Sequence, residues 1–198
     1  IITGLRRSGK SYLLNTLFVN HLLEQGVSAD CILQIDLEDA KNKPLRDPMV
    51  MLQYIEERSN DNRQYYVILD EVQLMSEFEE ILNTLLKRRK YDVYVTGSNS
   101  RFLVTDVITE FRGRGDEIRI YPLSVAELHE AFPEKSWIDL WREYSLYGGL
   151  PQVVLMTDEV QKPKYLKQIF RTTYLKDILH RSRIQQVEQL RQLIDFVA

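Results

Sequence analysis

Apolar and polar positions follow two different periods along this chain. Short, nearly continuous apolar runs predict buried strands, which we place at residues 1–3, 32–36, 65–69, 92–96 and 117–123. Between them, apolar residues recur three and four positions apart, and this spacing predicts helices over residues 10–25, 49–58 and 79–89. Residues 41–48 contain two prolines and are expected to form a loop. Because strands and helices alternate, we predict an α/β fold whose parallel sheet is covered on both faces.

The pattern changes after Pro122. Helical spacing returns at residues 124–132 and 137–147 and from residue 163 onward, with no further strand pattern. We therefore predict three parts, which are an α/β core at 1–122, a helical lid subdomain at 123–170 and the start of a C-terminal domain at 171–198. The chain opens inside a strand pattern and the helical spacing continues to its last residue, so we expect it to be a fragment.

The stretch "GLRRSGKS" at residues 4–11 fits the phosphate-loop pattern G-x-x-x-x-G-K-[ST] and lies between a predicted strand and a predicted helix. Glycines let backbone N–H groups and the helix N-terminus approach phosphates closely. We expect Lys10 to reach the β- and γ-phosphates and Ser11 to bind Mg²⁺. The predicted cofactors are ATP and Mg²⁺, and the predicted nucleotide-binding residues are Gly4, Arg7, Ser8, Gly9, Lys10, Ser11 and Tyr12.

The run "YVILDE" at residues 66–71 is a buried strand pattern that ends in two carboxylates. The carboxyl end of such a strand lies at the sheet edge where ligands bind in open α/β folds. We expect Asp70 to be a metal ligand and Glu71 to be the general base that activates water. The structural alternative is a polar helix start after a core strand.

Two further stretches carry candidate chemistry. Residues 93–99, "VYVTGSN", are a strand pattern that ends in small polar residues suited to contact a γ-phosphate or the attacking water. Residues 111–115, "FRGRG", place two arginines between glycines, where either one could stabilise a phosphoryl group in cis or from a neighbouring subunit. The structural alternatives are an ordinary turn for residues 93–99 and a solvated loop for residues 111–115. An arginine supplied by a neighbouring subunit would require a homo-oligomer.

Composition narrows the class of protein. The net charge is -3 and the calculated pI is about 5.7, which argues against a protein that coats nucleic acid through a strongly basic surface. A single cysteine excludes a disulfide framework and a multi-cysteine zinc site, and it fits a reducing cytosol. No apolar run approaches a membrane span and no signal peptide is visible, so we expect a cytoplasmic protein without a membrane partner.

Five ordered stretches, "GLRRSGKS", "YYVILDEVQ", "VYVTGSNS", "FRGRG…YPLS" and "YGGLP", resemble prokaryotic AAA-type ATPases. These proteins join an AAA domain to a C-terminal domain of uncharacterised function and are related to STAND and AAA+ proteins. The resemblance implies an additional-strand P-loop fold with strand order 5-1-4-3-2. It also implies that Lys10 and Ser11 belong to the Walker A motif and that Asp70 and Glu71 form the Walker B pair.

The resemblance implies further roles by position. Asn99 or Ser98 corresponds to sensor 1, and Arg114 corresponds to the arginine common in its loop, with Arg112 as the alternative. Pro151 in "YGGLP" resembles the glycine-proline motif whose proline packs near adenine. No arginine occurs in "YGGLPQVV", the region where AAA+ proteins often carry a sensor-2 arginine. The final residues resemble the opening of the C-terminal domain, which looks like a winged helix in some relatives.

These observations together predict Mg²⁺-dependent ATP binding and hydrolysis that drives a conformational switch. One alternative is a DNA-associated remodelling or loader ATPase, and another is a nucleotide-bound scaffold with little turnover. A P-loop kinase fits less well, because the sequence shows no acceptor-binding lid. A DNA or protein partner would bind through the C-terminal module.

Overall fold

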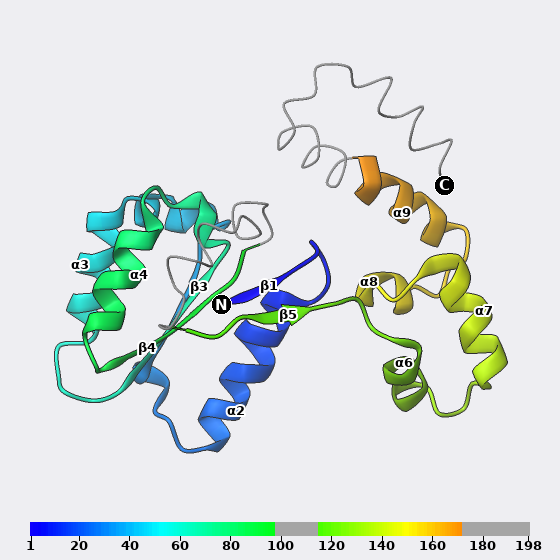
Figure 1. Ribbon diagram of the computed structural model, residues 1–198, viewed down its shortest axis with the longest axis horizontal. Helices are drawn as coiled ribbons and strands as arrows, with labels where there is room; N and C mark the ends of the chain where they lie inside the picture. Colours follow the sequence, from blue (N-terminus) through cyan, green and yellow to red (C-terminus); the bar gives the residue numbers. More distant parts are fainter. Residues whose placement is uncertain (98–114, 172–198) are drawn as a thin grey trace. The chain divides into compact units, whose positions relative to one another are not determined.

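A computed structural model describes residues 1–97 and 115–171 of the 198-residue chain. The chain divides into two compact units, Ile1–Pro122 and a second unit that begins at Leu123 (Figure 1). The first unit contains the strands and the second contains only helices within its described part.

The strands of the first unit pair in parallel, which confirms the predicted α/β fold. They are β1 (Ile2–Gly4), β2 (Ile32–Asp36), β3 (Tyr65–Asp70), β4 (Tyr91–Val95) and β5 (Ile118–Ile120). One ladder has the order β2-β3-β4 and another joins β1 to β5. A single parallel bridge, between Ile2 and Thr96, links the two ladders. The complete order 5-1-4-3-2 across that bridge stays a prediction.

The helix after β1 has an unusual middle section. It runs as α1 (Lys10–Tyr12), a π-helical segment η1 (Leu13–Phe18) and α2 (Val19–Glu24). The apolar spacing predicts the helix but not its π-helical turns, which are wider than α-helical turns and often occur at functional sites.

Two longer helices follow, α3 (Pro48–Arg58) and α4 (Phe78–Lys87). The Asp47 side chain caps α3 by accepting hydrogen bonds from the backbone N–H groups of the second and third helical residues. The expected loop at 41–48 is wrong over most of its length, because a 3₁₀ helix, η3 (Ala40–Arg46), forms there. The Asp39 side chain caps η3 by accepting from the Lys41 N–H group. Two shorter 3₁₀ helices are η2 (Ala29–Cys31) and η4 (Val72–Leu74).

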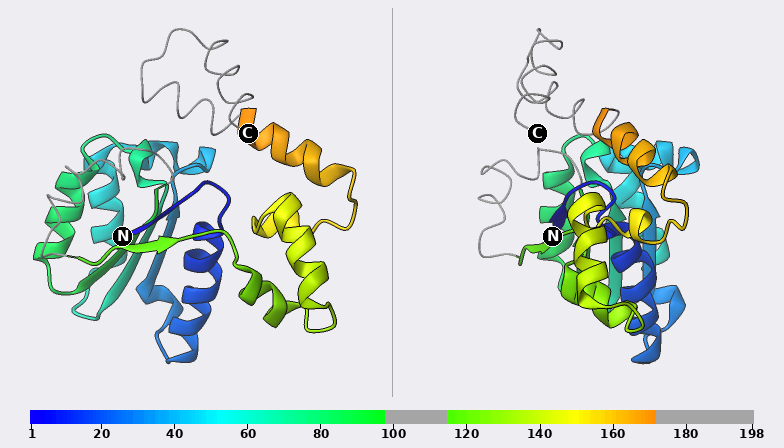
Figure 2. Two further views of the ribbon diagram at one scale, coloured as in Figure 1. Left: turned by 45° about the vertical axis from the view of Figure 1, so that its right-hand side comes forward. Right: turned by 90° about the vertical axis from the view of Figure 1, so that its right-hand side faces the viewer.

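Helices cover both faces of the strands (Figure 2). Val67 and Leu69 of β3 pack in a core with Ile55 of α3 and Leu85 of α4. Ile68 points to the opposite face, where it belongs to a cluster with residues of β1 and of the first helix. This alternation follows from the two-residue period of a strand, and burial on both faces explains why β3 reads as a continuous apolar run.

The second unit contains α6 (Val125–Ala131), α7 (Trp137–Tyr147), α8 (Pro151–Val154) and α9 (Gln161–Ile169). A capping box between Ser124 and Glu127 begins α6, and the Ser136 hydroxyl caps α7. A Cβ atom at Gly149 would lie 1.8 Å from the Leu123 carbonyl oxygen, so this close backbone approach requires glycine. The sequence pattern predicts α6, α7 and α9 but not the single turn of α8.

Candidate functional site

The loop between β1 and α1 has a backbone that only glycine permits at two points. Gly4 has a φ of 141°, and a Cβ atom there would lie 2.1 Å from the Ile120 carbonyl oxygen. Gly9 caps α1 in the left-handed conformation, with a φ of 100°. The Ser8 hydroxyl donates to the Leu5 carbonyl at 2.8 Å and closes the loop on itself. The glycine spacing seen in the sequence therefore corresponds to a tight, preformed loop at a helix N-terminus.

Lys10 is folded into this loop. Its Nζ atom donates to the carbonyl oxygens of Gly4, at 3.1 Å, and Leu5, at 2.7 Å, and the residue is only 4% exposed. Burial lowers the pKa of the Lys10 ammonium, whereas the nearby carboxylates of Glu71 and Asp70 act in the opposite direction. The structure thus brings the predicted phosphate-binding lysine close to both predicted carboxylates.

Asp70 is buried at the carboxyl end of β3 and is held through both of its oxygens. Oδ1 accepts a hydrogen bond from the hydroxyl of Thr96, which follows β4, and Oδ2 accepts from Asn15 Nδ2 at 2.9 Å. Asn15 lies in the π-helical segment η1, four residues after Ser11. Three separate parts of the chain therefore fix the direction of this carboxylate.

Glu71 follows Asp70 in a left-handed backbone conformation, with a φ of 54°, which is uncommon for a residue other than glycine. Its N–H group donates to the Thr96 hydroxyl at 3.0 Å. The single hydroxyl of Thr96 therefore joins the Asp70 side chain to the Glu71 backbone. Glu71 Oε2 accepts a hydrogen bond from Gln73 Nε2, so Gln73 holds the half-buried Glu71 side chain.

A further carboxylate, Glu38, lies at the same edge of the sheet. It follows β2, whose last residue, Asp36, is the register partner of Asp70. Desolvation raises the pKa of the Glu38 carboxyl, and the charge of Glu71 raises it further, whereas Arg6 acts against both. Carboxylates that follow two adjacent strands therefore lie within electrostatic reach of phosphate-loop residues, at the sheet edge where ligands bind in open α/β folds.

The remaining predicted loop residues lie at the surface of the first helical turn. Ser11 and Tyr12 are exposed, and Tyr12 is 62% exposed. Arg7 precedes this turn in the loop and has a left-handed backbone conformation, with a φ of 64°, although it is not a glycine. An exposed hydroxyl and aromatic ring next to the loop are in reach of a ligand from solvent.

Several predicted residues are not joined to this site by the structure. Ser98, Asn99, Arg112 and Arg114 lie outside the described residues. Pro151 is the first residue of α8 in the second unit. Their roles as sensor 1, arginine finger and adenine contact stay predictions.

Four residues of the site were not predicted from the sequence to take part in it, namely Asn15, Glu38, Gln73 and Thr96. Asn15 carries a usable signal, because a residue four positions after Ser11 lies on the same side of a helix. Thr96 was predicted only as the end of a strand. Glu38 and Gln73 follow predicted strands by two and four residues, and nothing local distinguishes them from ordinary polar loop positions.

The described residues contain neither a metal-binding cluster of acidic, histidine and cysteine side chains nor a membrane-spanning helix. Within residues 1–97 and 115–171, no three His, Cys, Asp or Glu side chains are grouped so as to hold a metal ion. None of the described helices is both long and apolar enough to cross a membrane. In the basic run at residues 87–90, Arg88 pairs with Glu56 and Lys90 donates to the Ser59 and Asp61 carbonyls, so two of its four charges have structural partners.

Comparison with known families divides the chain in two. Residues 1–129 match a family described as "AAA domain", and residues 138–198 match a "Domain of unknown function". An uncharacterised protein of Haemophilus influenzae is 35% identical over the whole chain, and an uncharacterised protein of Methanocaldococcus jannaschii is 23% identical over 98% of it. The chain spans about half the length of these curated relatives, 50% of the first and 44% of the second.

Two solved structures resemble the chain more distantly. Cdc6p from Pyrobaculum aerophilum aligns with 67% of this chain and 41% of its own length, at 14% identity and a TM-score of 0.44. A DNA polymerase III gamma subunit-related protein from Thermotoga maritima aligns with all of this chain and 71% of its own length, at 16% identity and a TM-score of 0.35. Because both scores lie below 0.5, the fold assignment rests on the strand pairings and the family match.

Proposed function

The chain belongs to the AAA domain family, and on this premise we propose that it binds ATP with Mg²⁺ and hydrolyses it to drive a conformational switch. Family membership supports nucleotide binding and hydrolysis in general. The proposal of Mg²⁺-dependent hydrolysis is supported by the position of Lys10. This residue lies in a tight loop at a helix N-terminus and interacts electrostatically with both Asp70 and Glu71.

The phosphates of ATP are assigned to the loop and to Lys10. The Lys10 ammonium already has two oxygen acceptors, the carbonyls of Gly4 and Leu5. The oxygens of a bound phosphate would replace them, so the ammonium keeps its hydrogen bonds while it neutralises substrate charge. The loop glycines and the first turn of α1 supply backbone N–H groups to the same phosphates.

Mg²⁺ would be held by Ser11 and Asp70. A hydroxyl and a carboxylate are hard oxygen ligands, and Mg²⁺ commonly takes only one or two side chains because substrate phosphates and water complete its shell. Each Asp70 oxygen accepts one hydrogen bond from the protein, and a carboxylate oxygen has about two lone-pair sites, so the donor set fits the ion. Bound there, the ion would supply positive charge to the transferring phosphoryl group.

Glu71 is proposed as the general base that accepts a proton from the attacking water. The Gln73 amide holds one of its oxygens, and the Thr96 hydroxyl holds its backbone N–H group. These two contacts act as positioning interactions, because they fix the direction from which the carboxylate meets the water. The attacking water would lie beside the phosphate loop, near Lys10 and the edge of the sheet.

Three assignments rest on the resemblance alone. We propose Asn99 as the sensor-1 side chain, Arg114 as the arginine that completes the site and Pro151 as an adenine contact. An arginine supplied by another subunit would require a homo-oligomer. For the whole protein, we also propose that the C-terminal module binds a DNA or protein partner. The curated relatives are about twice as long as this chain.

Steady-state ATP hydrolysis by the wild type and by Glu71→Gln tests the proposal. We expect turnover to fall by about 10²–10⁴-fold, the usual contribution of a positioned base, while ATP binding measured by calorimetry is retained. Glu80→Gln removes an exposed carboxylate elsewhere and serves as the matched control. Equal turnover in Glu71→Gln and the wild type would exclude Glu71 as the base. Wild-type binding without turnover would favour the scaffold, and stimulation by duplex DNA would favour a remodelling ATPase.

A further inference from the structure

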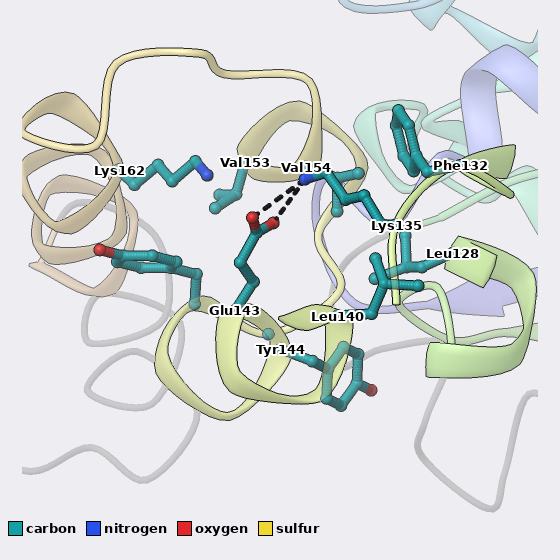
Figure 3. A pocket seen from close by; sticks show the side chains of 11 residues that line it. Leu128, Phe132, Lys135, Leu140, Glu143, Tyr144, Val153, Val154 and Lys162 are labelled. Atoms are coloured by element: carbon teal, nitrogen blue, oxygen red, sulfur yellow. Dashed lines mark hydrogen bonds and ion pairs between the residues drawn. The ribbon is translucent and has the colours of Figure 1, made fainter. Parts of the chain in front are cut away.

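The second unit contains a small pocket that the proposed ATPase site does not use (Figure 3). Its walls are mainly aromatic and aliphatic and include Leu128, Phe132, Leu140, Tyr144, Tyr147 and Val153. The space inside is about 20 Å³, which is enough for one or two water-sized atoms and too little for a nucleotide base. The pocket therefore suits a small group whose remainder extends outside.

One buried cation points into this pocket. Lys162 of α9 is only 6% exposed, and Figure 3 shows its ammonium directed towards Val153 and the centre of the pocket. The backbone N–H group of Lys162 donates to the Asp158 carbonyl, but between its ammonium and the other described residues the structure records neither a hydrogen bond nor an ion pair. Its recorded contact is with the face of the Tyr147 ring, at 5.0 Å from the centroid. Because no described residue pairs with it, the ammonium is available to an anionic acceptor that enters the pocket.

The other charges of the pocket neutralise one another. Lys135 Nζ lies 2.9 and 3.0 Å from the two carboxylate oxygens of Glu143, and this ion pair forms one wall (Figure 3). With Lys162 added, the pocket has a formal charge of plus one. The charge therefore matches a single negative charge, and the Glu143 carboxylate disfavours a more highly charged anion.

We propose that this pocket binds a carboxylate carried on an apolar body, with Lys162 as the anchoring cation. The small space admits the carboxylate while the apolar body extends outside, and the ammonium supplies a charge-assisted hydrogen bond. The carboxylate belongs either to a free small acid or to the C-terminus of a peptide, and both offer the same chemistry to Lys162. The proposal is independent of the ATPase site in the first unit.

Titration with benzoate tests the proposal, because the protein carries a local fluorescent reporter. The two tryptophans of the chain, Trp137 and Trp141, both lie on α7, the helix that contributes Glu143 and Tyr144 to the pocket. We expect a saturable change in tryptophan fluorescence with benzoate. Benzyl alcohol, which has nearly the same shape and no charge, should bind at least about tenfold more weakly, the usual difference for a hydrogen bond to a charged group.

Variants on α9 separate the anchor from its surroundings. Lys162→Met should weaken benzoate binding by about tenfold or more, whereas Lys162→Arg should retain it within a few-fold. Lys164→Met removes an exposed lysine two residues away and should change nothing. Thermal unfolding should show Lys162→Met to be about as stable as the wild type, because the lysine side chain makes no ion pair with the described residues and is replaced by an apolar chain of similar length. Loss of binding would then reflect the missing charge.

A tetrapeptide that ends in leucine, compared with its C-terminal amide, identifies the source of the carboxylate. Tighter binding of the free acid than of benzoate would support a peptide terminus, and weaker binding would support a small acid. Equal affinity for benzoate and benzyl alcohol, undiminished benzoate binding by Lys162→Met, or no saturable signal with the folded wild type would each overturn the proposal.

Discussion

Among the residues that the structure describes, two lysines are buried, one in each unit, and their surroundings differ. Lys10 is 4% exposed, donates to two backbone carbonyls and lies near two carboxylates. Lys162 is 6% exposed and faces an aromatic ring within an apolar pocket. The two lysines are therefore buried to nearly the same extent, and they differ in the hydrogen-bond acceptors around each ammonium.

This difference suggests how each lysine responds to an anion. In the proposed ATP complex, a phosphate at Lys10 would replace acceptors that are already present, so the loop would need little rearrangement and the gain would come from charge. An anion at Lys162 would supply the first charged acceptor among the described contacts of that ammonium.

The largest expected effect is on the Lys10 side of this comparison. Lys10→Met should lower ATP hydrolysis by roughly 10²–10³-fold, because a preorganised positive donor to the phosphates is lost. Steady-state turnover measured beside Lys164→Met, which removes an exposed lysine, provides the check. Wild-type turnover in Lys10→Met would break the distinction between the two lysines.

The next effect concerns the Thr96 hydroxyl, which joins the Asp70 carboxylate to the Glu71 backbone N–H group. Thr96→Val keeps the shape of the side chain but leaves the Asp70 carboxylate and the Glu71 N–H group without a shared partner. We expect the free energy of unfolding to fall by about 1–3 kcal/mol. Thr84→Val, which removes one hydrogen bond to the Glu80 carbonyl on the surface of α4, should cost less. Equal losses in urea unfolding would argue against a special role of Thr96.

A smaller effect should follow from the amide that holds Glu71. Gln73→Ala should lower kcat by roughly tenfold with little change in ATP affinity, since positioning is only part of the ~10²–10⁴-fold that a general base contributes. Gln53→Ala breaks a similar amide-to-carboxylate bond with Glu57 on the surface of α3 and is the matched control. An unchanged kcat in Gln73→Ala, measured at saturating ATP, would mean that Glu71 needs no such support.

The smallest expected effect is the pH dependence of stability through Glu38. The pKa of this carboxyl is raised above its ordinary value of 4.5, so the folded state favours the protonated form. Its stabilising contribution is present below pH 4.5 and is lost as the pH rises through the folded pKa. Glu38→Gln should therefore match the wild type at low pH and become more stable above that window. Parallel stability curves in urea at pH 4 and pH 7 would contradict this.

The parts of the site that the sequence predicts well are local in the chain. The glycine spacing, Lys10 and Ser11 lie within eight residues, and their backbone requirements can be read from residue types. The pair Asp70 and Glu71 follows a strand that is apolar throughout because both of its faces are covered. Strand position and edge chemistry therefore follow from the pattern alone.

The remaining parts depend on long-range pairing or on turns without a periodic signal. Thr96 and Asn15 meet Asp70 across 26 and 55 residues, and only strand pairing and helix docking bring them together. The π-helical segment η1 and the single turn of α8 are too short to set a period of their own. Lys162 lies in a polar stretch, "QKPKYLKQI", which gives no sign that this one lysine is buried.

The central claim is that the phosphate loop and the acidic sheet edge form one site for Mg²⁺ and ATP. Calorimetric titration of ATP with and without Mg²⁺, into the wild type and Asp70→Asn, tests it most directly. We predict that Mg²⁺ strengthens ATP binding to the wild type by about tenfold or more, the gain expected for charge-assisted ligation, and that Asp70→Asn loses this increment but still binds ATP without Mg²⁺. An ATP affinity that does not depend on Mg²⁺, or an increment that survives in Asp70→Asn, would contradict the account.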